Sequence, residues 1–207
     1  MISISPLKSE HQSKRRSLFL SALALSLSAA LSACGESTVT FKGSDISGSH
    51  LGQKWSLTGM DGKTYSPSDF SGKVTLVLFG FTQCPDVCPT SLAELAQVMK
   101  LLGEDAARVQ VLMITVDPER DTPEVLRAYV SGFDSRFMGL TGTPEQIKTA
   151  AGSFKAYYAR AATVNGNYNM DHSANFYLLD VKGESRVLLA NNAGAENIAH
   201  DIRALLR

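Results

Sequence analysis

The chain has 207 residues, of which 44% are hydrophobic and 19% are charged. This length and composition are ordinary for one globular domain with extensions, and they exclude a largely disordered chain. The formal net charge is zero, with 20 basic and 20 acidic side chains. The sequence holds no basic patch, so we expect no nucleic-acid partner.

Residues 1–33 have the pattern of a lipoprotein signal peptide. Basic residues 14–16 precede an apolar run over residues 18–31 that is too short and too rich in Ser and Ala for a membrane span. The run ends in Leu31-Ser32-Ala33-Cys34, which resembles the lipobox of bacterial lipoproteins. We therefore expect lipid on Cys34 and a domain held at the periplasmic face of a bacterial membrane. A plainly cleaved signal, which would leave Cys34 as a free thiol, is the alternative.

Residues 34–52 are rich in Ser, Thr and Gly and predict a flexible tether, so we expect the folded domain over residues 53–207. At the start of that domain, the Asp61-Gly62 pair separates two short strand-like runs and is typical of a β-hairpin turn. Trp55 is expected to pack in the core, and residues 66–70 predict a short helical turn.

Two cysteines, Cys84 and Cys88, lie between a strand-like run and a helix-like run. Residues 74–79 are apolar and rich in β-branched side chains, which predicts a strand buried on both faces. Residues 91–102 predict a helix, with Pro89 at its first position and Cys88 at or next to the N-cap. A thiolate there would face free N–H groups and the positive end of the helix dipole, which lowers the pKa of the thiol.

The spacing of Cys84 and Cys88 allows the two sulfurs either to chelate a soft metal ion or to form a redox-active disulfide. A purely structural disulfide is the plainer alternative. Closing so short a loop removes little chain entropy and would stabilise the fold weakly. The end of a central strand is also where α/β folds place their sites, so we favour a functional pair.

Residues 109–116 predict a second buried strand, and Thr122-Pro123 predicts the start of a helix. Strands that alternate with helices indicate a parallel sheet with right-handed crossovers. The intervening loop, which contains Asp117, Glu119, Arg120 and Asp121, should then open at the same edge as the cysteines. Its charges shape the electrostatics of the site or a docking surface, or they are simply solvated.

The rest of the chain continues the α/β pattern, without an internal repeat or a second domain. The expected elements are a short strand over residues 137–140, a helix from Thr143 toward residue 154, a strand over residues 157–162 with a turn at residues 165–167, a strand pair over residues 175–189, and a helix over residues 195–206.

His172, where a loop is expected to enter a strand, is the histidine best placed to act. Two thiolates and one imidazole make a ligand set suited to copper in both oxidation states. Zinc would accept the same ligands, although a structural zinc site normally has a fourth protein ligand, which the sequence does not offer. Nothing in the sequence itself shows that His172 reaches the cysteines, so a plain surface histidine stays an alternative.

Three stretches together resemble the Sco/SenC family of copper-binding proteins in order and spacing. They are Cys84-Pro85-Asp86-Val87-Cys88-Pro89, the stretch Val116-Asp117-Pro118-Glu119-Arg120-Asp121-Thr122-Pro123, and Asp171-His172-Ser173. The resemblance extends from about residue 53 to the C-terminus. It departs from many relatives at the anchor, because they use a transmembrane helix and this chain has a lipobox.

The resemblance implies an α/β, thioredoxin-like fold, here with an added N-terminal β-hairpin. It also implies one copper ion, Cu(I) or Cu(II), held by Cys84, Cys88 and His172, and a role in assembling the CuA centre of cytochrome c oxidase. The partner would be subunit II of the oxidase or another copper-delivery protein, and we expect a monomer. We expect Asp171 to orient the His172 ring or to balance charge, and Asp86 to support the ligands.

The competing hypothesis is an enzyme, a thiol-disulfide oxidoreductase that keeps the CuA-site cysteines of the oxidase reduced. Thioredoxin-like oxidoreductases usually have a C-x-x-C motif and a cis-proline before a later strand. Here the motif is C-x-x-x-C and no proline follows Pro144, so we favour a metal chaperone without catalytic residues. Passive storage or sensing of copper would use the same ligands.

Overall fold

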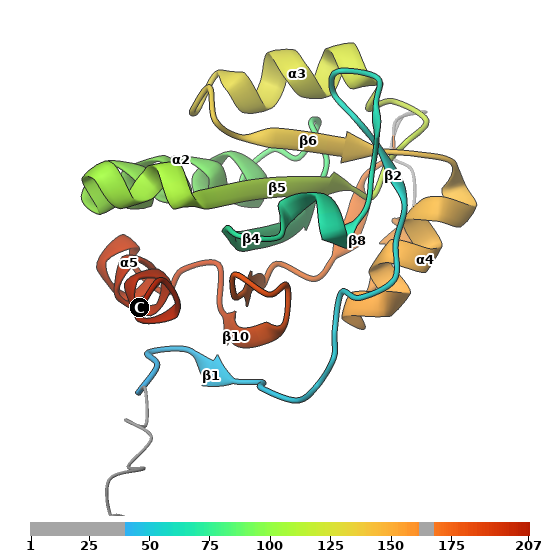
Figure 1. The fold of residues 1–207 in the computed structure, drawn as a ribbon. Helices are drawn as coiled ribbons and strands as arrows, with labels where there is room; N and C mark the ends of the chain where they lie inside the picture. Colours follow the sequence, from blue (N-terminus) through green and yellow to red (C-terminus); the bar gives the residue numbers. More distant parts are fainter. Residues whose placement is uncertain (1–39, 162–167) are drawn as a thin grey trace, which may run out of the picture. The chain divides into compact units, whose positions relative to one another are not determined.

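The computed structural model describes residues 40–161 and 168–207, which belong to one α/β unit from Thr40 to Arg207 (Figure 1). Its main sheet has eight strands in the order β1-β10-β9-β4-β5-β6-β2-β3. The strands are β1 (Ser44–Asp45), β2 (Leu57–Gly59), β3 (Thr64–Tyr65), β4 (Val74–Gly80), β5 (Val109–Thr115), β6 (Met138–Thr141), β9 (Phe176–Leu179) and β10 (Ser185–Leu189).

The middle of the sheet is parallel, as the alternation of strands and helices predicts. β4 pairs with β5, and β5 with β6, both in parallel register. The predicted hairpin is confirmed: β2 and β3 pair antiparallel and extend the sheet beyond β6, with Gly62 in the turn at a φ of +82° that favours glycine. On the other side, β9 and β10 form the predicted strand pair.

Helices cover both faces of the sheet because side chains of β4 alternate between them. Leu76 and Leu78 point to the face covered by α2 and α5, whereas Val77 and Phe79 point to the face covered by α4. Trp55 is buried on this second face, as predicted. The helices are α2 (Val87–Leu102), α3 (Pro123–Ser131), α4 (Pro144–Phe154) and α5 (Ala195–Leu205), with short 3-10 turns η2 (Pro67–Phe70) and η3 (Gly103–Arg108).

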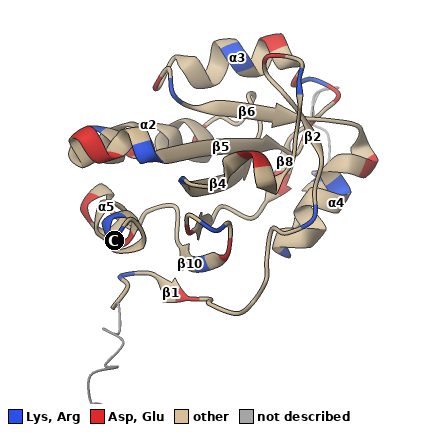
Figure 2. Ribbon diagram, in the orientation of Figure 1, with Lys and Arg blue, Asp and Glu red and all other residues tan. Residues whose placement is uncertain are grey.

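Acidic and basic residues are interspersed along these helices rather than separated by sign (Figure 2). None of the helices in the described part of the chain combines the length and the apolar character that crossing a membrane requires.

The start of α2 differs from its prediction. The helix begins at Val87, two residues before the predicted first position at Pro89, with Asp86 at the N-cap, so Cys88 and Pro89 both lie in its first turn. Proline is tolerated there because the first N–H groups of a helix have no partner within the helix. The proline therefore does not mark the first helical residue.

The predicted tether ends earlier than expected, and the domain does not start at residue 53. β1 pairs antiparallel with β10, and the N–H groups of Lys42 and Gly43 donate to the buried Asp201 carboxylate over 2.8 and 2.9 Å. The pairing with β10 and the hydrogen bonds to Asp201 of α5 hold this segment in place. Its residues are too polar for a strand to be predicted from the sequence. Residues 34–39 and the signal peptide lie outside the described residues.

The segment that carries His172 forms a small sheet of its own. β7 (Tyr158–Arg160) pairs antiparallel with β8 (Met170–His172), so the histidine lies at the end of a strand, whereas the prediction placed it where a loop enters a strand. The Ser173 N–H donates to the Tyr157 carbonyl over 2.9 Å and closes the pair. The turn predicted at residues 165–167 lies outside the described residues.

Candidate metal centre

The two cysteines lie at the carboxyl end of β4. Cys84 is half-buried in the loop after the strand, and Cys88 is buried in the first turn of α2. The Cys88 N–H donates to Cys84 Sγ over 3.4 Å, and both are free thiols. Gly80 allows this arrangement, because a Cβ at that position would lie 3.0 Å from Cys88 Sγ.

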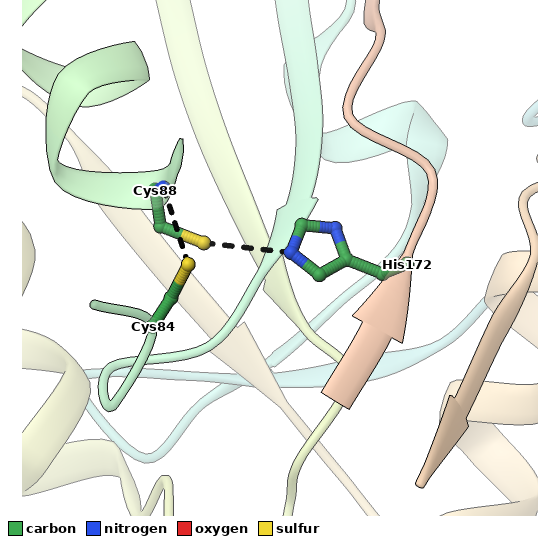
Figure 3. A group of neighbouring side chains, drawn as sticks. All are labelled: Cys84, Cys88 and His172. Atoms are coloured by element: carbon green, nitrogen blue, oxygen red, sulfur yellow. Dashed lines mark hydrogen bonds between the residues drawn. The ribbon is translucent and has the colours of Figure 1, made fainter. Parts of the chain in front are cut away.

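His172 points from the end of β8 toward the two sulfurs (Figure 3). Its Nε2 lies 3.6 Å from Cys88 Sγ, and the ligand atoms of Cys84, Cys88 and His172 all lie within 4.8 Å of one another. Nδ1 lies 3.0 Å from the Ser173 carbonyl oxygen, to which only a protonated Nδ1 can donate. When Nδ1 carries the proton, the lone pair of Nε2 faces the sulfurs. The Phe81 ring packs edge-to-face with the imidazole, with 5.8 Å between the two ring centres.

The electrostatics around Cys88 differ from the prediction. Burial raises the pKa of the Cys88 thiol, and the nearby Cys84 and Asp121 add to this effect. The sequence predicted that the helix N-terminus lowers this pKa, whereas the loss of solvent around the buried sulfur raises it. A metal cation reverses this balance, because a coordinating thiol loses its proton.

The two aspartates of the loop after β5 are buried rather than solvated. Asp121 accepts hydrogen bonds from the Thr82 N–H at 3.0 Å, from Thr82 Oγ1 at 2.6 Å and from Thr115 Oγ1 at 2.6 Å. Thr82 lies two residues before Cys84, so this carboxylate fixes the path of the cysteine loop. Asp117 contacts Arg120 and Tyr168. In the same loop, Glu119 is exposed and pairs with Arg160 at the surface.

Asp86 and Asp171 both lie near the ligands without bonding to them among the described contacts. Asp86 caps α2, and its carbonyl accepts from the Thr90 N–H over 3.2 Å. The Asp171 side chain is exposed, and successive residues of a strand point to opposite faces. The described bond that orients the imidazole goes to Ser173, so the expectation that Asp171 orients the ring is not met. Its role in charge balance stays a prediction.

Sequence reasoning missed two aromatic residues that shape the site. Phe81 follows β4 directly and lies against His172, and Tyr168 precedes β8 and bonds to Asp117. Their roles depend on contacts between distant segments, so the only signal was their closeness to the cysteine and histidine motifs.

An open groove of about 290 Å³ lies beside the three side chains. It is lined by Phe81, Cys84, Pro85, Asp86, Val87, Asn169, Met170, Asp171, His172 and Ala174. Two candidate ligands, Cys84 and His172, therefore face a space that another molecule can enter.

The fold and site define a class of protein: an α/β domain with two thiols and one imidazole gathered at the carboxyl end of its central strand, suited to a soft metal ion. Residues 43–207 match the model of the SCO1/SenC family. The chain therefore belongs to the SCO1/SenC family. The match begins at residue 43, close to the start of the structured domain at β1.

Similar proteins include bacterial and mitochondrial ones. The chain is 40% identical over 139 residues to the SCO2-like protein of Rickettsia felis, covering 65% of this chain and 66% of that protein. It is 38% identical over 161 residues to Protein SCO2, mitochondrial, of Saccharomyces cerevisiae, covering 74% of this chain and 54% of that protein. The matches thus cover between about half and two thirds of these relatives.

Among solved structures, the copper-bound ScoI of Bradyrhizobium japonicum has a TM-score of 0.71 and 40% identity, with 75% of this chain and 99% of that chain covered. This agreement confirms the expected thioredoxin-like fold.

Proposed function

We propose that this protein carries one copper ion on Cys84, Cys88 and His172 and delivers it for assembly of the CuA centre of cytochrome c oxidase. The observation that carries the proposal is the convergence of the three ligand atoms within 4.8 Å. Support comes from the Bradyrhizobium japonicum ScoI, which is 40% identical and has been solved with copper bound.

The ligand types favour copper over zinc. Soft thiolates suit Cu(I), and the imidazole adds a ligand that suits Cu(II), so the same set tolerates both oxidation states. A structural zinc site would normally close with a fourth protein ligand, and the group found in residues 40–161 and 168–207 has three members. Three ligands beside an open groove leave room for an incoming ligand from a partner, which suits transfer better than permanent storage.

The proposed partner is subunit II of the oxidase or another copper-delivery protein. The proposed location is the periplasmic face of a bacterial membrane, with a lipid anchor on Cys34. The lipobox at residues 31–34 supports the location, and membership of the SCO1/SenC family supports the partner.

We also propose that Asp86 and Asp171, which line the groove, balance the charge of bound copper. Asp171→Asn and Asp86→Asn should then bind Cu(II) more weakly than wild type. Unchanged affinity of both variants in copper titrations would remove this role.

A second candidate function is reduction of a disulfide in the oxidase. Two neighbouring free thiols, with Cys84 partly exposed, favour it. A Cys84 thiolate would attack one sulfur of the target disulfide and release the other as a thiolate. Cys88 would then attack the mixed disulfide, which releases the reduced target and leaves a Cys84–Cys88 disulfide. Against this function, the described residues have no cis peptide bond, whereas thioredoxin-like oxidoreductases usually have a cis-proline, and a possible metal ligand, His172, lies beside the thiols.

The variant His172→Ala separates the two functions, because only copper carriage needs the imidazole. If the protein is a chaperone, the variant loses copper, Cu(II) most of all, and fails to support oxidase assembly. The measurements are copper per protein chain and oxidase activity in cells. His50→Ala is the matched control, since His50 is exposed and contacts Glu184 instead of the cysteines. A copper-deficient His172→Ala that fully restores the oxidase would refute the chaperone and favour the reductase.

A further inference from the structure

Arg120 joins the two segments that supply the candidate ligands. Its side chain is only 16% exposed and extends from the loop after β5. One nitrogen, Nη1, donates to Gln83 Oε1 over 3.0 Å and to the Tyr168 carbonyl oxygen over 3.1 Å. Gln83 directly precedes Cys84, and Tyr168 precedes β8, the strand that ends at His172. A single guanidinium therefore bonds to both sides of the site.

Aromatic rings hold the same guanidinium from two directions. Its central carbon lies 3.8 Å from the centre of the Tyr168 ring and 5.8 Å from the centre of the Phe81 ring. Phe81 in turn lies edge-to-face against His172. Cation–π contacts of this kind gain strength where solvent is excluded. Arg120 thus reaches the imidazole through one intervening ring.

The buried carboxylate of Asp117 completes the arrangement. It accepts from Arg120 Nε and, through its other oxygen, from the Tyr168 hydroxyl over 2.7 Å. Asp117 is 2% exposed, so these partners take the place of water as hydrogen-bond donors to its oxygens. We call Arg120, Asp117, Tyr168 and Phe81 the Arg120 bracket.

Arginine suits this position better than lysine. Its planar group presents several N–H donors in fixed directions and stacks on an aromatic face, whereas an ammonium is a point charge on a flexible stem. Among the described residues, Arg120 donates to Asp117, Gln83 and the Tyr168 carbonyl, and its planar face stacks on the Tyr168 ring. A lysine would keep the charge beside Asp117 but could not reproduce this set of contacts.

We propose that Arg120 is a positioning residue that sets the place of His172 relative to Cys84 and Cys88, and thereby the affinity for Cu(II) relative to Cu(I). The inference rests on the proposed function. His172 lies on the small β7–β8 sheet, which is separate from the main sheet. The Arg120 bracket connects the segment before β8, at Tyr168, with Gln83 of the cysteine loop. Two thiolates can hold Cu(I) without the imidazole, but Cu(II) needs nitrogen.

The test compares Arg120→Ala and Arg120→Lys with wild type. Both variants should bind Cu(II) roughly 10- to 100-fold more weakly, the loss typical when a residue supporting a ligand is removed. Cu(I) affinity should change by less than about threefold, because the two sulfurs remain in place. Affinities for each ion come from competition with chelators, and the absorption spectrum of the Cu(II) form reports the ligand set.

A metal-free readout isolates the positioning role. In NMR spectra of the apoprotein, the contact between the His172 and Phe81 rings should weaken in both variants. Arg160→Ala is the matched control: Arg160 stacks on Tyr168 at 3.9 Å but is 50% exposed and pairs with Glu119 instead of the cysteine loop. This control should keep wild-type affinity for both ions and the ring contact.

Equal losses of Cu(I) and Cu(II) affinity in the folded Arg120→Lys protein would overturn the inference, as would wild-type Cu(II) affinity in either Arg120 variant. If Arg120→Ala does not fold, Arg120→Lys decides alone. The parallel variant His172→Ala separates this inference from the proposed function. If His172→Ala binds Cu(II) as wild type does, the proposed function fails; if it loses Cu(II) while both Arg120 variants keep it, only the inference fails.

Discussion

At the scale of single residues, the site depends on how closely small groups approach one another. Cys88 Sγ lies against the backbone of β4, where Gly80 leaves room for it. The direction of the His172 ring is supported by a hydrogen bond to one backbone carbonyl and by an edge-to-face contact with the Phe81 ring. Because these contacts are made by individual atoms, a change of a few atoms next to a ligand should alter metal binding.

Gly80→Ala tests this tolerance. The added Cβ would lie 3.0 Å from Cys88 Sγ and 3.2 Å from Met113 Cε, so the thiol must move by a few tenths of an ångström. We expect copper affinity to fall roughly tenfold, in the range caused by loss of supporting contacts, and stability to fall by about 1–3 kcal/mol from overpacking.

Gly152→Ala is the matched control, because its added Cβ meets no atom within 4 Å in α4. It should leave copper binding unchanged and raise stability by about 0.5–1 kcal/mol. Isothermal copper titration and urea unfolding measure both effects. Unchanged copper affinity in Gly80→Ala would show that the site accommodates the displaced sulfur.

At the scale of elements, segments outside the central strands hold the domain together and shape the site. The loop after β5 places the Asp121 carboxylate against the cysteine loop and the Asp117 carboxylate against Tyr168, and the N-terminal segment adds β1 beside β10. Both arrangements depend on buried aspartates that bond to distant backbone or hydroxyl groups. Changing those aspartates should therefore affect single elements in ways that can be measured.

Asp121, in the loop after β5, makes the stability of the folded protein depend on pH. Burial raises its pKa in the folded state above the unfolded value of about 3.9. The folded protein then holds the proton more tightly than the unfolded chain, so this contribution to stability falls as pH rises from the unfolded pKa through the folded pKa.

Asp121→Asn removes that titration. The free energy of unfolding of wild type should therefore decrease relative to that of the variant as pH rises from about 4. Urea unfolding of both metal-free proteins across this range measures the difference. If the difference in the free energy of unfolding between the two proteins does not change with pH, or if wild type becomes relatively more stable as pH rises, the pKa of Asp121 is not raised.

Asp201→Asn tests the attachment of β1. The native carboxylate accepts from the N–H groups of Lys42 and Gly43 through its two oxygens, and an amide offers only one acceptor. We expect faster hydrogen exchange at these two amides and a loss of about 1–2 kcal/mol of stability.

Asp105→Asn, at an exposed ion pair with Arg108, is the control and should change neither quantity. If the amides of residues 42 and 43 exchange as slowly in Asp201→Asn as in wild type, contacts other than those with Asp201 hold the segment before β1.

At the scale of the whole molecule, the sequence predicts those features that depend on local patterns. Apolar runs predicted β4 and β5, and Thr-Pro pairs at Thr122 and Thr143 predicted the starts of α3 and α4. These succeed because burial and capping act within a few residues.

Features that depend on residues far apart in the chain could not be predicted from local sequence patterns. β1 has two exposed polar residues, and the segment before it is fixed by Asp201, 158 positions beyond Gly43. The meeting of His172 with Cys88 spans 84 positions and depends on how the β7–β8 sheet packs. No local pattern encodes these contacts, so the ligand set came from family resemblance alone.

The anchor of the molecule is tested with Cys34→Ala. If Cys34 carries lipid, the variant should shift from the membrane to the soluble fraction, because the acyl chains provide the membrane affinity. Cys84→Ala, the same substitution outside the lipobox, should stay in the membrane fraction. Fractionation with immunodetection measures both. Continued membrane attachment of Cys34→Ala would exclude a lipid anchor at this residue.

The most direct test of the central claim is X-ray absorption spectroscopy of the protein loaded with one Cu(I), the ion that two thiolates can still hold in the comparison variant His172→Ala. We predict two sulfur ligands and a histidine nitrogen around copper in wild type, with the two sulfurs retained and the nitrogen lost in the variant. A wild-type spectrum without sulfur ligands, or one identical to that of His172→Ala, would contradict a copper site built from Cys84, Cys88 and His172.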